Sequence, residues 1–217
     1  MDQTPPLNLQ DIRQEYIKAA LDETAAHASA IDQFDAWFRQ ALQADIQEPT
    51  AMNLSTVDGE GQLSSRIVLL KEFSAEGFVF YTNYRSRKAQ AIKMHAQVAL
   101  LFFWPELERQ IRIEGKAKQV PEETSDAYFQ SRPLGSRIGA WASPQSQVIT
   151  GRHILEENVK ALEKEYQQKP VPRPPHWGGF LVRPQRIEFW QGRASRLHDR
   201  LCYQKKPDGW QIERLAP

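Results

Sequence analysis

The sequence predicts a mainly β protein: an antiparallel β-barrel with helices at its periphery. From residue 51 onward the apolar residues change from helical spacing to an alternation of two, and turn-forming residues separate the apolar stretches at hairpin-like intervals. Nine short strands result. Neither side of the proline-rich stretch 169–175 holds enough strands to close a sheet alone. We therefore expect a flexible arm at residues 1–9 and a single domain over residues 10–217.

The individual elements follow from periodicity and turn residues. A helix is expected at residues 31–46 because Ile31, Phe34, Phe38 and Leu42 follow the 3.6-residue period. The other expected helices are at residues 11–21, 85–95, 122–131 and 151–168. Strands are expected at residues 51–57, 64–73, 78–82, 98–104, 109–120, 179–182, 186–190, 201–205 and 210–214.

Composition excludes several classes of protein. The chain has 28 Lys and Arg against 27 Asp and Glu, and a net charge of +1 argues against general binding to nucleic acid or to a membrane surface. A single cysteine, Cys202, excludes an intramolecular disulfide. No apolar run is long enough to span a bilayer, the first twenty residues lack a signal-peptide core, and the five histidines show no metal-ligand spacing. We expect a cytoplasmic protein without a metal.

Two segments concentrate positive charge. In IEFWQGRASRLHDR (187–200), an extended chain from Arg196 onward would project Arg196, His198 and Arg200 from one face, where an anion would relieve their repulsion. Near the start of the helix expected at 85–95, Arg87 and Lys88 lie where the helix dipole disfavours cations, and a phosphate there would be stabilised by free N–H groups. A solvated basic turn and an exposed basic helix start are the alternatives.

Two further patterns suit phosphate groups. Arg66 and Lys71 bracket four apolar residues, and in an unbulged strand their odd spacing places them on opposite faces, as surface residues or as ligands of two anions. Tyr128, Arg132 and Ser136 combine a guanidinium with two hydroxyls. Both patterns also fit solvent-exposed polar residues without a special role.

Together the motifs resemble the pyridoxine/pyridoxamine 5′-phosphate oxidase family. They are RIVLLK (66–71), FYTNxxSRK (80–88), LERQ (107–110), YFxSRP (128–133), EFWQGxxxRLHDR (188–200) and the final RLAP, in order along nearly the whole chain. The resemblance implies an FMN-binding split β-barrel. It also implies a homodimer with FMN at the interface, and a C-terminal segment that takes part in substrate binding and dimerisation.

The resemblance assigns residues to each ligand. Arg66 and Lys88, helped by Arg87 and Thr82, would hold the FMN phosphate. The rest of the flavin would be contacted by Ile67, Val68, Leu69, Leu70, Lys71, Tyr81, Gln110, Gln145, Ser146, Trp190 and Arg200. The substrate phosphate would be bound by Lys71, Tyr128, Arg132 and Ser136. Arg196, Leu197 and His198 would lie over the pyridine ring, with Arg196 and His198 as catalytic residues, and Arg13 and Tyr16 would form a lid.

The implied reaction is oxidation of pyridoxamine or pyridoxine 5′-phosphate to pyridoxal 5′-phosphate, in vitamin B6 synthesis and salvage. Oxygen would be the acceptor, releasing H₂O₂, and the amine substrate would also release NH₃. Two alternatives stay open: a flavin split-barrel oxidoreductase with another substrate, and a non-enzymatic anion-binding module such as a single-strand nucleic-acid barrel. The residues do not decide the protonation state of His198.

Overall fold

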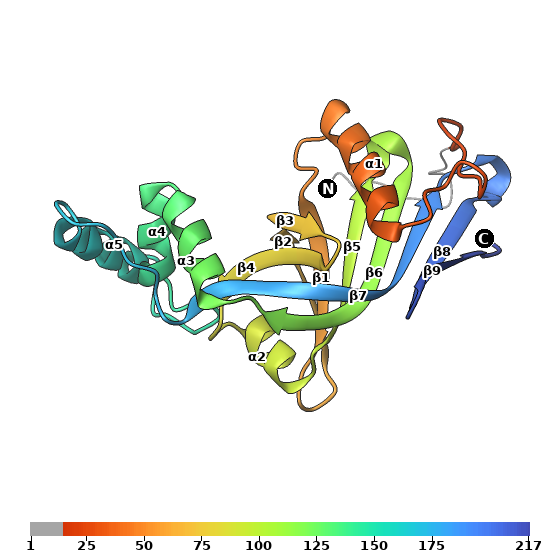
Figure 1. The fold of residues 1–217 in the computed structure, drawn as a ribbon. Coiled ribbons are helices and arrows are strands. Elements are labelled where there is room, and N and C mark those ends of the chain that lie inside the picture. Colours follow the sequence, from red (N-terminus) through yellow and green to blue (C-terminus); the bar gives the residue numbers. More distant parts are fainter. Residues whose placement is uncertain (1–14) are drawn as a thin grey trace, which may run out of the picture.

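A computed structural model describes residues 15–217 of the chain (Figure 1). Its helices are α1 (Ala30–Gln43), α2 (Arg87–Met94), α3 (Glu122–Ser131), α4 (Leu134–Ala142) and α5 (His153–Glu165). Its strands are β1 (Ala51–Val57), β2 (Leu63–Leu69), β3 (Glu72–Ser74), β4 (Gly77–Asn83), β5 (Gln97–Trp104), β6 (Arg109–Gln119), β7 (Trp177–Gln191), β8 (Asp199–Lys206) and β9 (Gly209–Arg214). The arm predicted at residues 1–9 lies outside the described residues.

The strands form one antiparallel, curled sheet, which confirms the predicted fold class. The main path runs β2-β1-β5-β6-β7-β4-β3, and β8 and β9 extend it beside β7. The 15-residue strand β7 organises the sheet: β6 pairs with most of its length, β4 pairs with its first part, and β8 pairs with its last part. In Figure 1, β7 runs from the base of helices α3–α5 to the region of β8 and β9.

A shift in the pairing of β6 with β7 lets β7 stay continuous through Pro184, which has no N–H to donate to a neighbouring strand. The pairing of β6 with β7 shifts register between Glu114 and Gly115, opposite Pro184. A Cβ atom on Gly115 would lie 2.2 Å from the carbonyl oxygen of Arg183, so only glycine fits this close approach. The sequence predicted two separate strands here, at 179–182 and 186–190, and that prediction is wrong.

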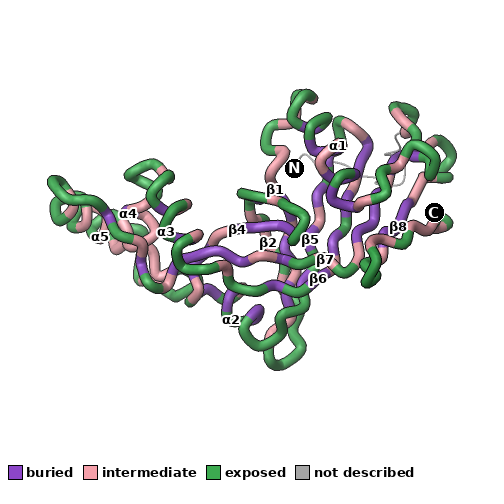
Figure 2. The backbone as a smooth tube through the Cα atoms, in the orientation of Figure 1, coloured by how far each residue is buried: buried purple, intermediate pink, exposed green. Residues whose placement is uncertain are grey.

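Helix α1 covers the main core. Ser29 caps it by accepting hydrogen bonds from the backbone N–H groups of Ile31 and Asp32. Phe34 is fully buried, with ring centroids 4.8 Å from Phe78 on β4 and 5.3 Å from Phe102 on β5. Figure 2 shows that buried stretches of the sheet lie under α1. Truncating a Phe in such a position to Ala typically costs about 3–5 kcal/mol.

A smaller core lies under helices α3–α5 and positions the cavity described below. It consists of Phe129, Ile138, Val171 and Trp177, with partly buried aromatic residues packed against it. Arg173 in the proline-rich stretch joins this region to α3, because its Nε donates to Asp126 at 2.6 Å. Helix α4 was not predicted, since its sequence LGSRIGAWA contains two glycines, which disfavour a helix, and directly follows Pro133.

Two other element predictions are corrected. The described part of the helix predicted at 11–21 is not helical: the N–H of Lys18 donates to Glu108 at 3.0 Å and that of Leu21 to Asp199 at 3.1 Å, in place of helical bonds. The strand predicted at 64–73 divides into β2, which pairs with β1, and β3, which pairs with β4. The break falls at Leu70–Lys71.

None of the helices described for residues 15–217 is long and apolar enough to cross a membrane.

Candidate active site

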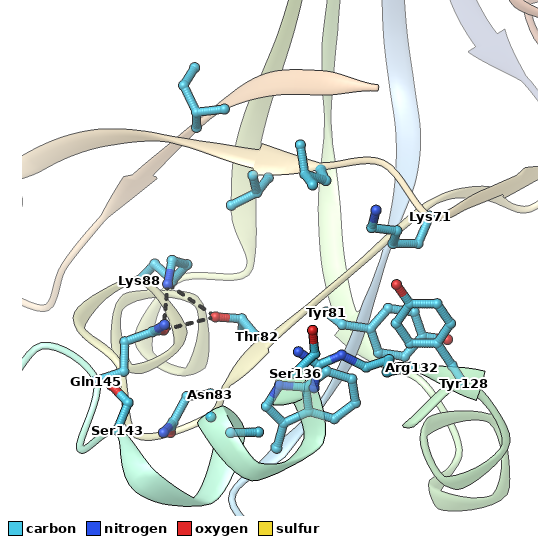
Figure 3. Close-up of a pocket in the computed structure, with 16 residues that line it drawn as sticks. Lys71, Tyr81, Thr82, Asn83, Lys88, Tyr128, Arg132, Ser136, Ser143 and Gln145 are labelled. Atoms are coloured by element: carbon cyan, nitrogen blue, oxygen red, sulfur yellow. Dashed lines mark hydrogen bonds between the residues drawn. The ribbon is translucent and has the colours of Figure 1, made fainter. Parts of the chain in front are cut away.

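A cavity of about 480 Å³ lies between the sheet and helices α3 and α4 (Figure 3). That volume falls within the range of small-molecule and cofactor sites, roughly 300–1,000 Å³. Most of the predicted phosphate and flavin residues of the first two thirds of the chain line it. They are Ile67, Val68, Leu69, Lys71, Tyr81, Thr82, Lys88, Tyr128, Arg132, Ser136 and Gln145.

One end of the cavity is formed by Lys88, the second residue of α2. Its Nζ donates to Gln145 Oε1 at 2.8 Å, to Thr82 Oγ1 at 3.0 Å and to Ser86 Oγ at 3.4 Å, and Figure 3 shows the first two bonds. All three acceptors are neutral. Burial, together with the charge of Arg66, lowers the pKa of Lys88 to about 8. A cation held by neutral partners is a site where an anion is favoured.

Arg66 and Arg87 add positive charge next to Lys88. The guanidinium of Arg66 donates to the carbonyl of Leu54, to Thr56 Oγ1 and to Ser64 Oγ, again all neutral groups. Burial, and secondly the charge of Arg87, lowers the pKa of Arg66. These cations surround the start of α2, whose first turn contains no acidic residue. The cluster suits a dianionic phosphate at a helix N-terminus.

The other end of the cavity is formed by Arg132 at the end of α3. Its guanidinium lies 4.6 Å from the ring centroid of Trp177, and burial lowers its pKa. Its Nη1 is buried and finds no hydrogen-bond partner among residues 15–217. Figure 3 places Lys71, Tyr128 and Ser136 around it. A buried guanidinium nitrogen without a partner, close to hydroxyl and ammonium donors, fits a second phosphate.

A second group of predicted residues lies at the C-terminal end of β7. The rings of Tyr16, Trp190 and His198 form a cluster, with centroids 5.7 Å apart for Tyr16–Trp190 and 4.6 Å apart for Trp190–His198. Tyr16 also packs on Gly192, where a Cβ atom would lie 2.7 Å from the Tyr16 ring. Tyr16, predicted as a lid residue, therefore lies beside His198. Arg13 lies outside the described residues.

The turn that carries Arg196 and His198 has an unusual backbone conformation. Ser195 and Arg196 adopt φ of 54° and 62°, a left-handed conformation that is unfavourable for non-glycine residues. The backbone N–H of Arg193 donates to His198 Nδ1 at 3.1 Å. Burial and then the charge of Arg196 lower the pKa of His198. Since Nδ1 accepts from this backbone N–H, Nε2 is the nitrogen that can donate a proton.

Three predicted flavin residues form one row across the sheet. Gln110 on β6 is paired with Trp190 on β7, and Trp190 is paired with Arg200 on β8. Paired residues in an antiparallel sheet project from the same face. Separate segments of the sequence therefore come together on one surface. Next to this row Arg112 is in register with Glu188, whose buried carboxylate no sequence pattern indicated.

The two groups are far apart within one chain. Trp177 lines the cavity at the start of β7, whereas Trp190, thirteen residues further along the same strand, belongs to the second group. At about 3.3 Å per residue this separation is roughly 40 Å. Figure 1 shows the same arrangement, with α3–α5 and β8–β9 at opposite ends. A small ligand at the Arg132 end of the cavity therefore cannot contact the second group of the same chain.

Some predicted residues lie elsewhere, and some cavity residues were missed. Leu70 is buried in the main core, Ser146 is exposed with φ of 71°, and Leu197 is 70% exposed. The missed lining residues are Asn83, Gly139, Ala140, Ser143 and Trp177. Asn83 belongs to the FYTNxxSRK motif but was assigned to no ligand, and Gly139 and Ala140 were missed with helix α4 itself.

Comparisons with known sequences agree over nearly the full length. Residues 38–166 match the family described as "Pyridoxamine 5′-phosphate oxidase", and residues 177–217 match "Pyridoxine 5′-phosphate oxidase C-terminal dimerisation region". A pyridoxine/pyridoxamine 5′-phosphate oxidase of Cyanothece sp. is 54% identical over 97% of this chain and 99% of its own length. That of Bordetella petrii is 56% identical over 97% of this chain and 100% of its own length.

Solved structures show the same architecture. PhzG from Burkholderia lata 383, in complex with tetrahydrophenazine-1-carboxylic acid, superposes with a TM-score of 0.85 at 28% identity, covering 89% of this chain and 95% of that one. An FMN-binding protein related to pyridoxamine 5′-phosphate oxidase, from Nostoc punctiforme, has a TM-score of 0.70 at 17% identity, covering 87% and 98%. At that identity the second structure supports the fold alone.

Proposed function

The chain belongs to the pyridoxine/pyridoxamine 5′-phosphate oxidase family, and we propose that it converts pyridoxamine or pyridoxine 5′-phosphate to pyridoxal 5′-phosphate with FMN as its cofactor. Oxygen as the acceptor, release of H₂O₂ and a cytoplasmic location are parts of this proposal. The observation that supports it most is the pair of cationic clusters at opposite ends of one cavity. Two clusters accommodate one phosphate of the cofactor and one of the substrate.

The residues present fit FMN. Lys88, Arg66 and Arg87 would hold its phosphate, because the hydrogen-bond partners of Lys88 and Arg66 are neutral and leave their charges uncompensated. Thr82 and Gln145 orient the Lys88 ammonium toward this end of the cavity. FMN, when bound, supplies the hydride acceptor that no side chain of the protein can provide.

Arg132 and its neighbours would hold the substrate phosphate. An anion that enters would give the buried Nη1 of Arg132 a hydrogen-bond acceptor, so binding would satisfy this donor. Lys71, Tyr128 and Ser136 supply further donors. Fixing the phosphate orients the pyridine ring, which lowers the entropic part of the barrier. This cluster also favours a phosphorylated substrate over those of other flavin oxidoreductases.

A second copy of the chain would complete each site. The family's C-terminal dimerisation region covers β7–β9, and the sheet face that carries Gln110 also exposes apolar side chains. Phe103, the partner of Gln110 in register, is 57% exposed, and Ile67 is 63% exposed. We propose that this face pairs with its copy, bringing Gln110, Trp190, Arg196, His198 and Arg200 of one chain to the cavity of the other.

Within the completed site His198 would donate a hydrogen bond from Nε2 to the substrate ring, since its Nδ1 already accepts from the backbone. Arg196, which is exposed and held by a left-handed backbone, would lie over the ring and stabilise its negative charge.

Oxygen uptake tests the function. The FMN-loaded protein is given pyridoxamine 5′-phosphate while flavin absorbance, peroxide and aldehyde are recorded, with unphosphorylated pyridoxamine as the matched control. We expect peroxide and aldehyde in equal amounts, and a far lower rate with the control. A protein that binds FMN but leaves the phosphorylated amine unchanged would refute the proposed substrate.

A further inference from the structure

Glu188 is a buried acid near the C-terminal end of β7, on the sheet face that carries Gln110, Trp190 and Arg200. It is 3% exposed, although carboxylates are rarely buried without a role. Its Oε1 accepts from Arg200 Nε at 2.9 Å and its Oε2 accepts from Arg112 Nη1 at 3.3 Å. A single carboxylate on the central strand therefore links an arginine on β8 with an arginine on β6.

These contacts fix the direction of the Arg200 side chain. Glu188 holds its Nε, and the carbonyl of Ala216 accepts from its Nη1 at 2.8 Å. Its Nη2 donates to no group within residues 15–217. Since guanidinium donors form a rigid planar fork, fixing Nε and Nη1 also fixes where Nη2 points. Arg200 is in register with Trp190, so its Nη2 is fixed within the row of predicted flavin residues.

We propose that Glu188 is a positioning residue for the cofactor: it orients Arg200 so that Nη2 is available to the flavin. The inference rests on the proposed function, in which Arg200 contacts FMN. Glu188 itself does not need to touch the cofactor. An apolar residue would fill the same space without the desolvation cost of a carboxylate, so orientation of the two arginines accounts for an acid at this place.

Charge and positioning predict opposite effects, which makes the proposal testable. FMN is anionic, so removing a nearby negative charge should tighten its binding if Glu188 acted only through the electrostatic field. If Glu188 acts by orienting Arg200, its removal should weaken FMN binding. Glu114 provides the matched control: it contacts Arg112 at 3.5 Å, is 45% exposed, and makes no contact with Arg200.

The experiment measures the FMN dissociation constant by flavin fluorescence for wild type, Glu188→Gln and Glu114→Gln. Circular dichroism and size-exclusion chromatography check the fold and oligomeric state. We expect Glu188→Gln to bind FMN about tenfold more weakly, the loss typical of one charged hydrogen bond, and Glu114→Gln to bind within about twofold of wild type. Glu188→Gln binding as tightly as wild type, or more tightly, would overturn the proposal.

Two further variants separate positioning from folding. Glu188→Asp keeps the charge but withdraws the carboxylate from Arg200 Nε, so weaker FMN binding by a folded Glu188→Asp supports positioning and wild-type affinity refutes it, even if Glu188→Gln does not fold. In an Arg200→Lys background, Glu188→Gln should have little additional effect, because its target is already lost. If wild type itself fails to bind FMN, the proposed function fails; if only the variants behave as wild type, this inference alone fails.

Discussion

Raising the pH through 8 should weaken FMN binding, because the cation proposed to hold the cofactor phosphate loses its proton there. In the ligand-free protein, burial and Arg66 lower the pKa of Lys88 to about 8. A bound phosphate dianion favours the charged ammonium and raises that pKa again. Below pH 8 Lys88 is charged in both states, so affinity is insensitive to pH. Above pH 8 the free protein must take up a proton to bind.

The size of the effect follows from the two pKa values. If phosphate restores the Lys88 pKa to an ordinary ~10.4, the dissociation constant at pH 9 is about tenfold larger than at pH 7, or ~1.4 kcal/mol. The phosphate's own second pKa is near 6 and adds nothing in this window. The assay is a fluorescence titration of FMN at several pH values between 7 and 9. Lys88→Arg, which stays charged, should give a flat profile. An equal pH dependence in wild type and Lys88→Arg would refute the reasoning.

The other predictions concern binding, assembly and local order. Arg132→Met should lower kcat/KM for the phosphorylated amine about 100-fold. It should not lower the melting temperature of the ligand-free protein, because the buried Nη1 is unpaired among residues 15–217. A lower Tm with unchanged KM would contradict this. Phe103→Asp should shift the protein from dimer to monomer in size-exclusion chromatography and reduce FMN retention, whereas Leu42→Asp, equally exposed on α1, should do neither. Asp199→Ala should speed amide exchange at Leu21, because the Leu21 N–H donates to the Asp199 carboxylate. Unchanged exchange would show that this hydrogen bond does not order the segment around Leu21.

Much of the fold could be predicted because local signals agreed with the final structure. Alternating apolar residues and turns located the strands of the first part of the sheet, and α1 follows its periodicity closely. The errors arose where tertiary contacts decide. The N-terminal segment around Leu21 is bound by Asp199, distant in sequence, and no local pattern predicts that. The continuity of β7 depends on Gly115, which lies on another strand and accommodates the bulge opposite Pro184.

The chemistry of the candidate site could be predicted from the sequence, but the separation of its residues into two distant groups could not. Charge clusters at Lys88 and Arg132 were visible as phosphate-binding patterns, and the resemblance supplied their roles. The odd spacing of Arg66 and Lys71 predicted two faces of one strand, whereas the chain leaves β2 before Lys71 and the two residues belong to different segments. That the residues near Trp190 lie roughly 40 Å along the strand from Trp177, at the Arg132 end of the cavity, follows only from the continuous strand. Glu188 gave no signal, since a single acid in an apolar run does not reveal its partners.

The length of β7 has a genetic consequence. If two copies pair as proposed, each chain contributes its cavity to one site and its C-terminal turn to the other. A chain inactivated at Lys88 and a chain inactivated at Arg196 would then form a mixed dimer in which one site carries both defects and the other carries none. Random pairing of the two inactive chains makes about half of the dimers mixed, each with one intact site of two, and should restore about a quarter of wild-type activity. Two defective alleles could therefore complement each other, whereas two alleles with defects in the same half of the chain could not.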